Sequence, residues 1–354
     1  MLSYLHKGPA KDSRLHVFWH LRGGIGDCAV ARLAVLALRE KLPDAVFYFH
    51  TDSPGAASAL FVEDERHIFL PPGEPLWYKY DLAFEICQSF KTVHVNHSRV
   101  EKWAPDFLPL LEKMQQRQAQ VSFFLQDNYL MEDLLGQFAV QQRLPRAALI
   151  SYLSGLDFDP LSGPALPREL THKAGVARFG LESKKYITLH DGIDSTFALD
   201  KRPLKCWPRE NWRQLAGLLK EKYPDICLVQ LGGKNSSVFD FVDKSLVGKT
   251  QVKDLPALLQ HSLLHLDGES GLVQLTRFLD THCVVLFGPT DKDYFGLTKN
   301  TNLKENLCGS CMWLLGTAWH TRCALGYETC RNMDALTAAK VFEAACAALA
   351  KKLH

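Results

Sequence analysis

The chain alternates short apolar runs with longer segments in which apolar residues recur every three or four positions. Apart from two histidines, Leu15–Leu21 is apolar, and the segment after it repeats apolar residues at helical spacing, at Val30, Leu33, Ala34, Ala37 and Leu38. These periods predict a strand followed by a helix, which a proline and an aspartate end before the next apolar run at 45–50. This alternation is typical of a parallel sheet with crossover helices.

The same alternation resumes after a stretch rich in glycine and proline between about 155 and 185. We therefore expect an α/β fold of the GT-B type: two Rossmann-like, doubly wound domains facing a central cleft, with a closing C-terminal helix. The predicted parts are an N-terminal domain (1–165), a linker (166–184), a second domain (185–332) and a helix (333–354). Asp334 is the expected N-cap of that helix.

Composition narrows the classes of function. A chain of 354 residues exceeds what one core usually supports, and 41 basic against 39 acidic residues give no electrostatic case for nucleic acid. The first residues, 1–7, contain no apolar core of a secretory signal, and no apolar run is long enough to span a membrane. Ten cysteines without an export signal indicate reduced thiols or metal ligands, so we expect a cytoplasmic protein.

A glycine-rich turn, Gly23-Gly24-Ile25-Gly26-Asp27, joins the first predicted strand to the first helix, where α/β sheets bind ligands. Gly24, Gly26 and Ala29 fit the loose dinucleotide fingerprint, so an NAD(P)-dependent oxidoreductase is one hypothesis. Against it, Asp27 places a carboxylate at the helix N-terminus that a pyrophosphate would need. A plain helix-capping role for Asp27 is a further interpretation.

Four turns of the second predicted domain carry residues suited to a nucleotide. Lys205, in the segment Lys205-Cys206-Trp207-Pro208, can reach a phosphate from the end of a strand, although a solvated lysine beside a packed tryptophan is the plainer interpretation. Turns at Gly232-Gly233, Glu269-Ser270-Gly271 and Gly288-Pro289-Thr290-Asp291 follow other predicted strands. Four such turns at one sheet edge indicate a nucleotide site.

The order of these motifs, from about Leu15 to Arg331, resembles the heptosyltransferases. These are inverting GT-B glycosyltransferases that use ADP-heptose in lipopolysaccharide core assembly. The resemblance implies that Asp27 is the catalytic base and that Gly24 and Gly26 give the acceptor room. It also implies that Lys205 neutralises the departing diphosphate, so that the chemistry requires no divalent metal.

The remaining donor contacts follow from the same resemblance. They are Gly232, Gly233 and the backbone N–H groups of Ser270 and Gly271. Glu269 and Gln274 stand where relatives have an aspartate and a histidine. Gln274 can hydrogen-bond a phosphate but cannot carry charge.

A cysteine-rich segment, 308–330, is the other candidate site. Cys308 and Cys311 form a CxxC knuckle, and Cys323 and Cys330 complete a candidate tetrahedral thiolate set for structural zinc or, second, iron. The resemblance extends to this segment, because relatives also carry a cysteine-rich segment at this place. The loop between the two cysteine pairs is shorter in the relatives than in this chain. Packed free thiols and disulfides are the alternatives, the latter disfavoured in the cytoplasm.

The expected function is transfer of a sugar, heptose first, from an ADP-sugar to an acceptor hydroxyl. The acceptor is a glycan, a lipid-linked glycan or a protein, and peripheral contact with the inner membrane is compatible with this. An NAD(P)-dependent oxidoreductase and a non-catalytic sugar-nucleotide-binding protein are the alternatives. Nucleic acid is not expected as a partner.

Overall fold

The computed structural model describes residues 9, 12–62, 64–71, 73, 76–126, 129–193 and 203–353. The expectation about a secretory signal concerns residues 1–7, which lie outside the described residues. The chain divides into two compact units. Unit 1 comprises Met1–Ala139 and Arg146–Gly163, and unit 2 comprises Val140–Pro145 and Pro164–His354.

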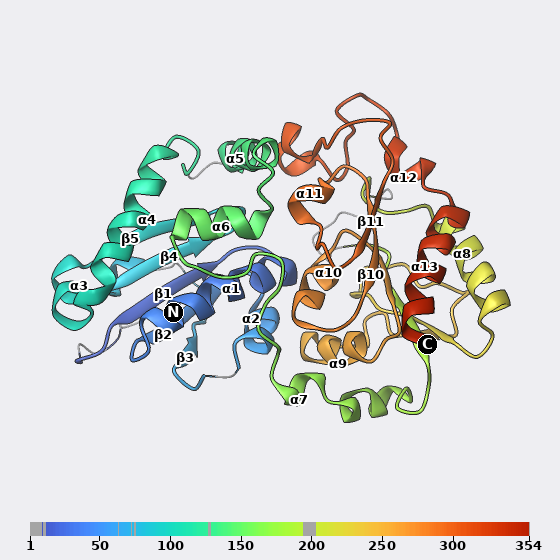
Figure 1. Ribbon diagram of the computed structural model, residues 1–354, viewed down its shortest axis with the longest axis horizontal. Helices are drawn as coiled ribbons and strands as arrows, with labels where there is room; N and C mark the ends of the chain where they lie inside the picture. The colour runs from blue at the N-terminus through green and yellow to red at the C-terminus, as the bar shows by residue number, and fades with distance from the viewer. Residues whose placement is uncertain are drawn as a thin grey trace, which may run out of the picture. The chain divides into compact units, whose positions relative to one another are not determined.

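Unit 1 is built on a five-stranded sheet of order β3-β2-β1-β4-β5 (Figure 1). Its strands are β1 (His16–Leu21), β2 (Val46–Thr51), β3 (His67–Phe69), β4 (Leu82–Ile86) and β5 (Phe90–Val95). The first four are parallel, whereas β5 pairs antiparallel with β4. Residues 87–89, which join β4 to β5, are too few for a crossover, so the chain turns back as a hairpin.

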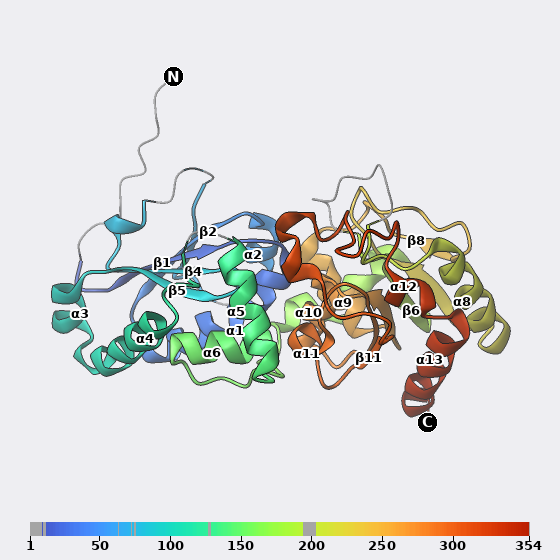
Figure 2. The same ribbon diagram turned by 90° about the horizontal axis from the view of Figure 1, so that it is seen from above.

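The helices of unit 1 lie between and after these strands in the sequence. They are α1 (Ile25–Lys41), α2 (Pro54–Leu60), α3 (His97–Trp103), α4 (Leu108–Gln120), α5 (Tyr129–Gln141) and α6 (Arg146–Ser154). On one face of the sheet, α6 packs between α1 and α4 (Figure 2). This places the first residue of α6, Arg146, near the first turn of α1.

Unit 2 is built on a six-stranded, all-parallel sheet of order β11-β10-β9-β6-β7-β8. Its strands are β6 (Tyr186–Leu189), β7 (Cys227–Gln230), β8 (Lys244–Ser245), β9 (His265–Gly268), β10 (Cys283–Phe287) and β11 (Thr301–Lys304). The parallel order brings the carboxyl ends of β6, β7, β9 and β10 to one edge. The predicted doubly wound α/β class is confirmed for both sheets.

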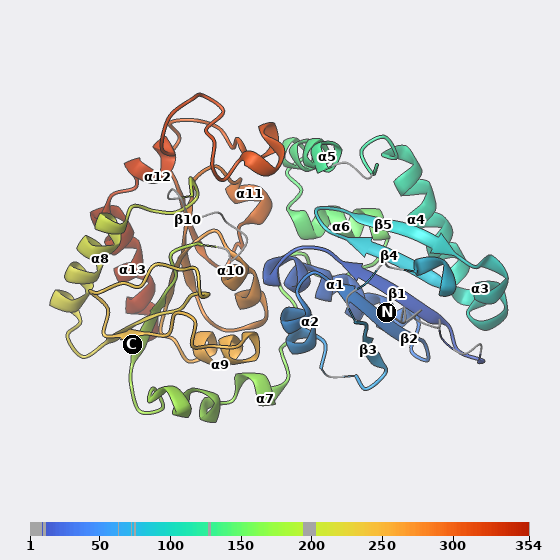
Figure 3. The same ribbon diagram turned by 180° about the vertical axis from the view of Figure 1, so that it is seen from behind.

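The helices of unit 2 are α7 (Arg168–Thr171), α8 (Arg209–Lys222), α9 (Leu255–Gln260), α10 (Gly271–Leu275), α11 (Lys292–Phe295), α12 (Arg331–Ala335) and α13 (Ala338–Leu353). Helices α8 and α13 pack side by side (Figure 3), and their apolar faces share a core with β6, β9 and β10. The buried Trp207 joins this core and donates its indole N–H to the carbonyl of Leu336 at 2.8 Å.

The expected N-cap of the C-terminal helix is wrong. Asp334 lies inside α12, and Leu336, the residue after α12, is extended before α13 begins. The hydroxyl of Thr337 instead accepts the backbone N–H of Lys340 at 3.3 Å. Among the described residues, no helix combines the length and apolar character needed to cross a bilayer.

Candidate functional site

The glycine turn of unit 1 holds Asp27 against its own backbone. Gly23 has a φ of +97°, and a Cβ at this position would lie 2.2 Å from Oδ2 of Asp27. The same Oδ2 accepts the backbone N–H of Gly24 at 2.7 Å, which is half of a capping box at the start of α1. Only glycine combines this backbone conformation with this close approach.

A buried arginine holds the other carboxylate oxygen. Nη2 of Arg146 donates to Oδ1 of Asp27 at 2.6 Å and also to the carbonyl of Cys87. The Arg146 side chain is 6% exposed and that of Asp27 is 23% exposed. Asp27 is therefore fixed through both oxygens and still reachable from solvent.

The backbone of the turn is also engaged by residues that follow β2. Asp52 accepts the N–H of Gly23 at 3.1 Å, and the hydroxyl of Ser53 donates to the Gly23 carbonyl at 2.8 Å. Two consecutive N–H groups, those of Gly23 and Gly24, thus point at carboxylates of the chain itself. A bound pyrophosphate would have to displace both.

A charged cluster lies beside this turn at the ends of β1 and β4. Glu85 accepts a hydrogen bond from Nδ1 of His20 at 2.9 Å, and its other oxygen lies 3.5 Å from both Arg22 and Lys91. Burial would raise the pKa of Glu85, but the His20 hydrogen bond and the neighbouring cations lower it to about 2. Glu85 is therefore an ionised, partly buried carboxylate next to the glycine turn.

In unit 2, Lys205 lies in the loop before α8 and is 9% exposed. Its Nζ lies 5.9 Å from the centre of the Trp319 ring, and its charge acts on His190. Gly232 is also closely packed, since a Cβ there would lie 2.6 Å from the Ser236 hydroxyl oxygen. A Cβ at Gly233 would meet no other atom within 4 Å, so this turn leaves open space beside the strand end.

A buried polar network, not anticipated from the sequence, lies under these turns. Asp267 is fully buried at the end of β9 and receives three side chains: His190 at 2.9 Å, His265 at 3.1 Å and the Ser270 hydroxyl at 2.5 Å. Thr188 lies 3.0 Å from the second ring nitrogen of His265. Every polar atom of the Asp267 carboxylate is therefore engaged.

The network pairs an acidic group, Asp267, with a basic one, His190. Burial would lower the pKa of His190, but the Asp267 carboxylate raises it through its charge and hydrogen bond, with help from Asp191. Burial would raise the pKa of Asp267, but His190 and His265 lower it to about 2. The native state therefore favours an imidazolium at His190 paired with the Asp267 carboxylate.

The network extends to a third turn through Asp191. Its Oδ1 lies 3.7 Å from Nε2 of His190 and accepts the Ser236 hydroxyl at 3.1 Å, while Oδ2 accepts the Ser237 N–H at 3.0 Å. Asp267, His190 and Asp191 thus connect the turns that follow β6, β7 and β9. All three turns were expected to contact the donor.

The hydroxyl of Ser270 and the amide of Gln274 are both used inside unit 2. The Ser270 hydroxyl donates to Asp267 and accepts the Leu272 N–H, so only backbone N–H groups at Ser270 and Gly271 remain for a phosphate. Gln274 is buried, donates to the Phe295 carbonyl at 2.7 Å and accepts from Arg277 at 3.2 Å. We leave Gln274 out of the donor site because its amide is used inside the unit.

The four cysteines of the cysteine-rich segment lie in one neighbourhood. Asn332, two residues after Cys330, accepts the N–H of Cys308 at 3.3 Å and donates to its carbonyl at 3.0 Å. Burial and the other thiols raise the pKa of Cys311 and Cys330. Within the described part of the chain, no three His, Cys, Asp or Glu side chains converge at metal-binding separation, Cys323 and its neighbours included.

Comparison with known proteins supports the motif resemblance. Residues 184–312 match the model of glycosyltransferase family 9 (heptosyltransferase), which spans the donor turns and Lys205. Among curated protein sequences, no significant match to this chain is found.

Solved structures share the fold over nearly the whole chain. The ADP-heptose lipopolysaccharide heptosyltransferase II of E. coli is 13% identical, with 96% of this chain and 100% of that chain aligned at a TM-score of 0.56. A family 9 glycosyltransferase of Veillonella parvula is 12% identical, with coverages of 97% and 99% and a TM-score of 0.55.

A third similar structure is that of TibC from enterotoxigenic E. coli, an iron-containing heptosyltransferase in complex with ADP-D-β-D-heptose. It is 12% identical, with coverages of 97% and 78% and a TM-score of 0.56. At these identities the structures show the fold. The resemblance is thereby confirmed over the matched region: residues 184–312 match the glycosyltransferase family 9 (heptosyltransferase) model, and the whole chain has the fold of the heptosyltransferase structures.

Proposed function

We propose that this chain is an inverting glycosyltransferase that transfers a sugar from an ADP-sugar to an acceptor hydroxyl. Heptose is the first candidate for this sugar. The acceptor belongs to a lipopolysaccharide, another cell-envelope glycan or a protein. The family 9 match over the donor turns supports the class of reaction. The observation that carries the mechanism is the Asp27 carboxylate, held on both oxygens yet partly exposed in the first turn of α1.

Asp27 is the proposed base of a single displacement. As the acceptor oxygen forms its bond to the anomeric carbon, the bond from that carbon to the diphosphate breaks, and the hydroxyl proton passes to Asp27. A positioned carboxylate is what a weak alcohol nucleophile needs. Gly24 and Arg146 each use one lone pair of a carboxylate oxygen, so another remains on each oxygen for the proton.

The leaving diphosphate is proposed to bind in unit 2. Lys205 supplies a positive charge, and the N–H groups of Ser270 and Gly271 supply hydrogen bonds where negative charge develops. Gly232 and Gly233 line the adjacent turn, and Glu269 begins the Ser270 loop.

The turn geometry favours this proposal over the dinucleotide hypothesis. In a dinucleotide fold the turn amides hold the pyrophosphate, whereas here Asp27 and Asp52 already accept the amides of Gly24 and Gly23. Two carboxylates at that place would also repel the diphosphate. A non-catalytic nucleotide-binding protein is separated from an enzyme by the transfer assay below.

Transfer is tested with ADP-heptose and a panel of cell-envelope glycans, lipid-linked glycans and proteins, with ADP release as the readout. Asp27→Asn keeps the side-chain shape but removes the base, so we expect transfer to fall by at least about 100-fold with ADP affinity unchanged. The exposed Asp44, which follows α1, provides the matched control Asp44→Asn. Full activity of Asp27→Asn would show that Asp27 only caps α1 and is not the base.

A structural metal at the cysteine-rich segment is a separate proposal. Four thiols within residues 308–330 have the donor chemistry of tetrahedral zinc or iron, and the structure of TibC is described as that of an iron-containing protein. The side chains of Cys308, Cys311, Cys323 and Cys330 would have to turn toward one another to bind it, because they do not converge as placed. Such a metal would order the loop and take no part in the transfer.

Elemental analysis of the untagged, full-length protein tests this proposal. We expect about one equivalent of zinc or iron. Cys308→Ser should lose the metal, whereas Cys346→Ser, in α13, should keep it. Wild-type protein that contains no bound zinc or iron would contradict the proposed metal site.

A further inference from the structure

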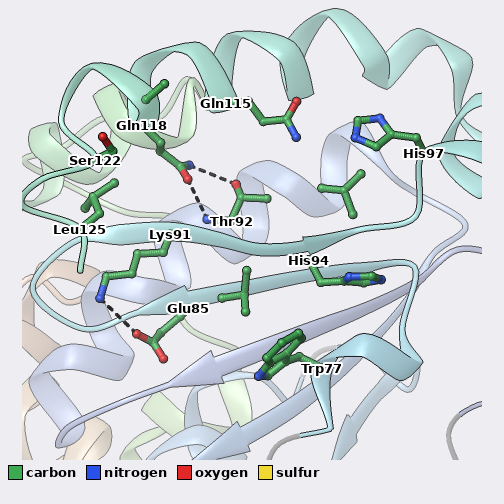
Figure 4. A pocket seen from close by; sticks show the side chains of 13 residues that line it. Trp77, Glu85, Lys91, Thr92, His94, His97, Gln115, Gln118, Ser122 and Leu125 are labelled. Atoms are coloured by element: carbon green, nitrogen blue, oxygen red, sulfur yellow. Dashed lines mark hydrogen bonds and ion pairs between the residues drawn. The ribbon is translucent and has the colours of Figure 1, made fainter. Parts of the chain in front are cut away.

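A cavity of about 770 Å³ runs along β5 in unit 1, below α4, and we refer to it as the β5 groove (Figure 4). Its walls include Trp77, Glu85, Lys91, His94, Gln115 and Ser122. These residues come from the 3₁₀ turn before β4, from β4 and β5, and from α4 and the turn after it.

The walls combine an aromatic face with neutral polar groups. Trp77 is 39% exposed, and its ring centre lies 6.4 Å from that of His94. Across the groove, α4 contributes the amide of Gln115, and the hydroxyl of Ser122 follows (Figure 4). A sugar ring presents a face of C–H bonds and a rim of hydroxyls, which suit an exposed indole and amide groups respectively.

The charges in the groove nearly cancel. Glu85 and Lys91 lie 3.5 Å apart, and Lys91 also pairs with Glu132. The lining therefore offers no surplus positive charge that would select a phosphate or carboxylate ligand. The Glu85 carboxylate, which is an acceptor only, can still receive hydroxyl donors.

One end of the groove meets the turn that holds Asp27. Glu85 lies 3.5 Å from Nη1 of Arg22, the residue directly before Gly23. Two residues after Glu85, the carbonyl of Cys87 accepts from Arg146, the partner of Asp27. The end of β4 thus contributes both to the groove and to the setting of Asp27.

We propose that the β5 groove is a carbohydrate subsite that binds an uncharged, hydroxylated sugar residue of the acceptor glycan. This rests on the proposed function only in naming the ligand an acceptor; the binding itself does not. A glycan held between Trp77 and Gln115, with its end at Glu85, would present its reactive hydroxyl toward the Asp27 turn.

The test is binding of the full chain to an array of neutral oligosaccharides and their phosphorylated counterparts, with dissociation constants for the hits. We expect neutral glycans to bind and Trp77→Ala to weaken them about tenfold or more, the usual loss on truncating a central aromatic anchor. Gln115→Ala should weaken the same glycans. The matched control is Tyr78→Ala, since Tyr78 is 58% exposed beside Trp77 and does not line the groove.

A calorimetric profile that keeps both unfolding transitions of the wild type reports an intact fold for each variant. No binding of neutral glycans, preference for the phosphorylated set, or equal binding by Trp77→Ala would overturn the subsite. Binding that depends on Trp77 supports the subsite even if no ADP-sugar is turned over. Transfer without Trp77-dependent binding overturns the subsite and leaves the proposed function standing.

Discussion

At the scale of single residues, Asp27, the proposed base, is a helix cap that also pairs with an arginine. Its Oδ2 caps α1 through Gly24, and its Oδ1 meets a buried arginine. A cap alone does not need Arg146, whose burial is costly unless its charge is paired. The ion pair fixes the direction of the carboxylate, as a base that must meet an acceptor hydroxyl requires.

Arg146 is therefore expected to be a positioning residue. Arg146→Met should lower kcat about 100-fold, since a displacement of the base by about 1 Å can cost that much, with ADP affinity unchanged. Arg146→Lys should recover part of the rate because it restores the charge without the planar donor. Steady-state kinetics with ADP titrations check this, and a wild-type kcat in Arg146→Met would show that the pair is only structural.

A second prediction at the scale of single residues concerns Gly23. Gly23→Ala forces a Cβ into the Asp27 carboxylate at a positive φ, and we expect a loss of about 1–3 kcal/mol in unfolding free energy together with most of the activity. Gly217→Ala, in open space on α8, is the control and should stabilise by about 1 kcal/mol. Urea unfolding of both variants gives the comparison, and equal stability for Gly23→Ala would contradict the described turn.

The sequence identifies Asp27, Lys205 and the strand-end turns because each follows a recognisable apolar strand. It does not reveal Arg146, since contacts across 119 residues leave no local pattern. His190 and Asp267, 77 residues apart, are equally hidden because the predicted strands place them without pairing them. Such partners follow from sheet order, which a single sequence leaves open.

At the scale of elements, three turns of unit 2 depend on one buried network. Helix α10 has only five residues, so its N-terminus alone offers little to an anion. The Ser270 turn is held instead by Asp267, and the turns after β6 and β7 by His190 and Asp191. The proposed donor site is thus held by side chains beneath the turns as well as by the glycines of the turns.

This network predicts a pH dependence of stability. The native pKa of His190 is raised above 6.5, so its charged form stabilises the native state below pH 6.5, and this contribution is lost as pH rises through the native value. The native pKa of Asp267 is about 2 against 3.8, so its contribution is present above pH 3.8 and lost toward pH 2.

Urea unfolding of the wild type between pH 6 and 9 should therefore show stability falling as pH rises, beyond the change in a His190→Gln variant. Asp267→Asn, which removes the carboxylate partner of His190, should flatten this fall. Identical profiles for the wild type and His190→Gln would contradict the assigned ion pair.

Element types were also easier to predict than their pairing. The antiparallel direction of β5 follows from the short connection after β4. The break that separates α12 from α13 follows from one extended residue, Leu336. The edge strand β8 has two residues, too few for a periodic signal.

At the scale of the whole molecule, the chain consists of two units with separate sheets and different strand orders. The proposed roles divide in the same way, with the base and the β5 groove in unit 1 and the donor turns in unit 2. Two such units are expected to unfold in separable steps, so a ligand of one unit should act on one transition.

Calorimetric unfolding of the full chain with ADP, ADP-heptose, NAD or NADP tests the central claim most directly. At about 100 times its dissociation constant, ADP or the ADP-sugar should stabilise its unit by about 2.7 kcal/mol and raise one transition by on the order of 5 °C. The dinucleotides should leave both transitions unchanged. Protection by NAD or NADP with none by ADP or ADP-heptose would contradict a glycosyltransferase and favour the dinucleotide hypothesis.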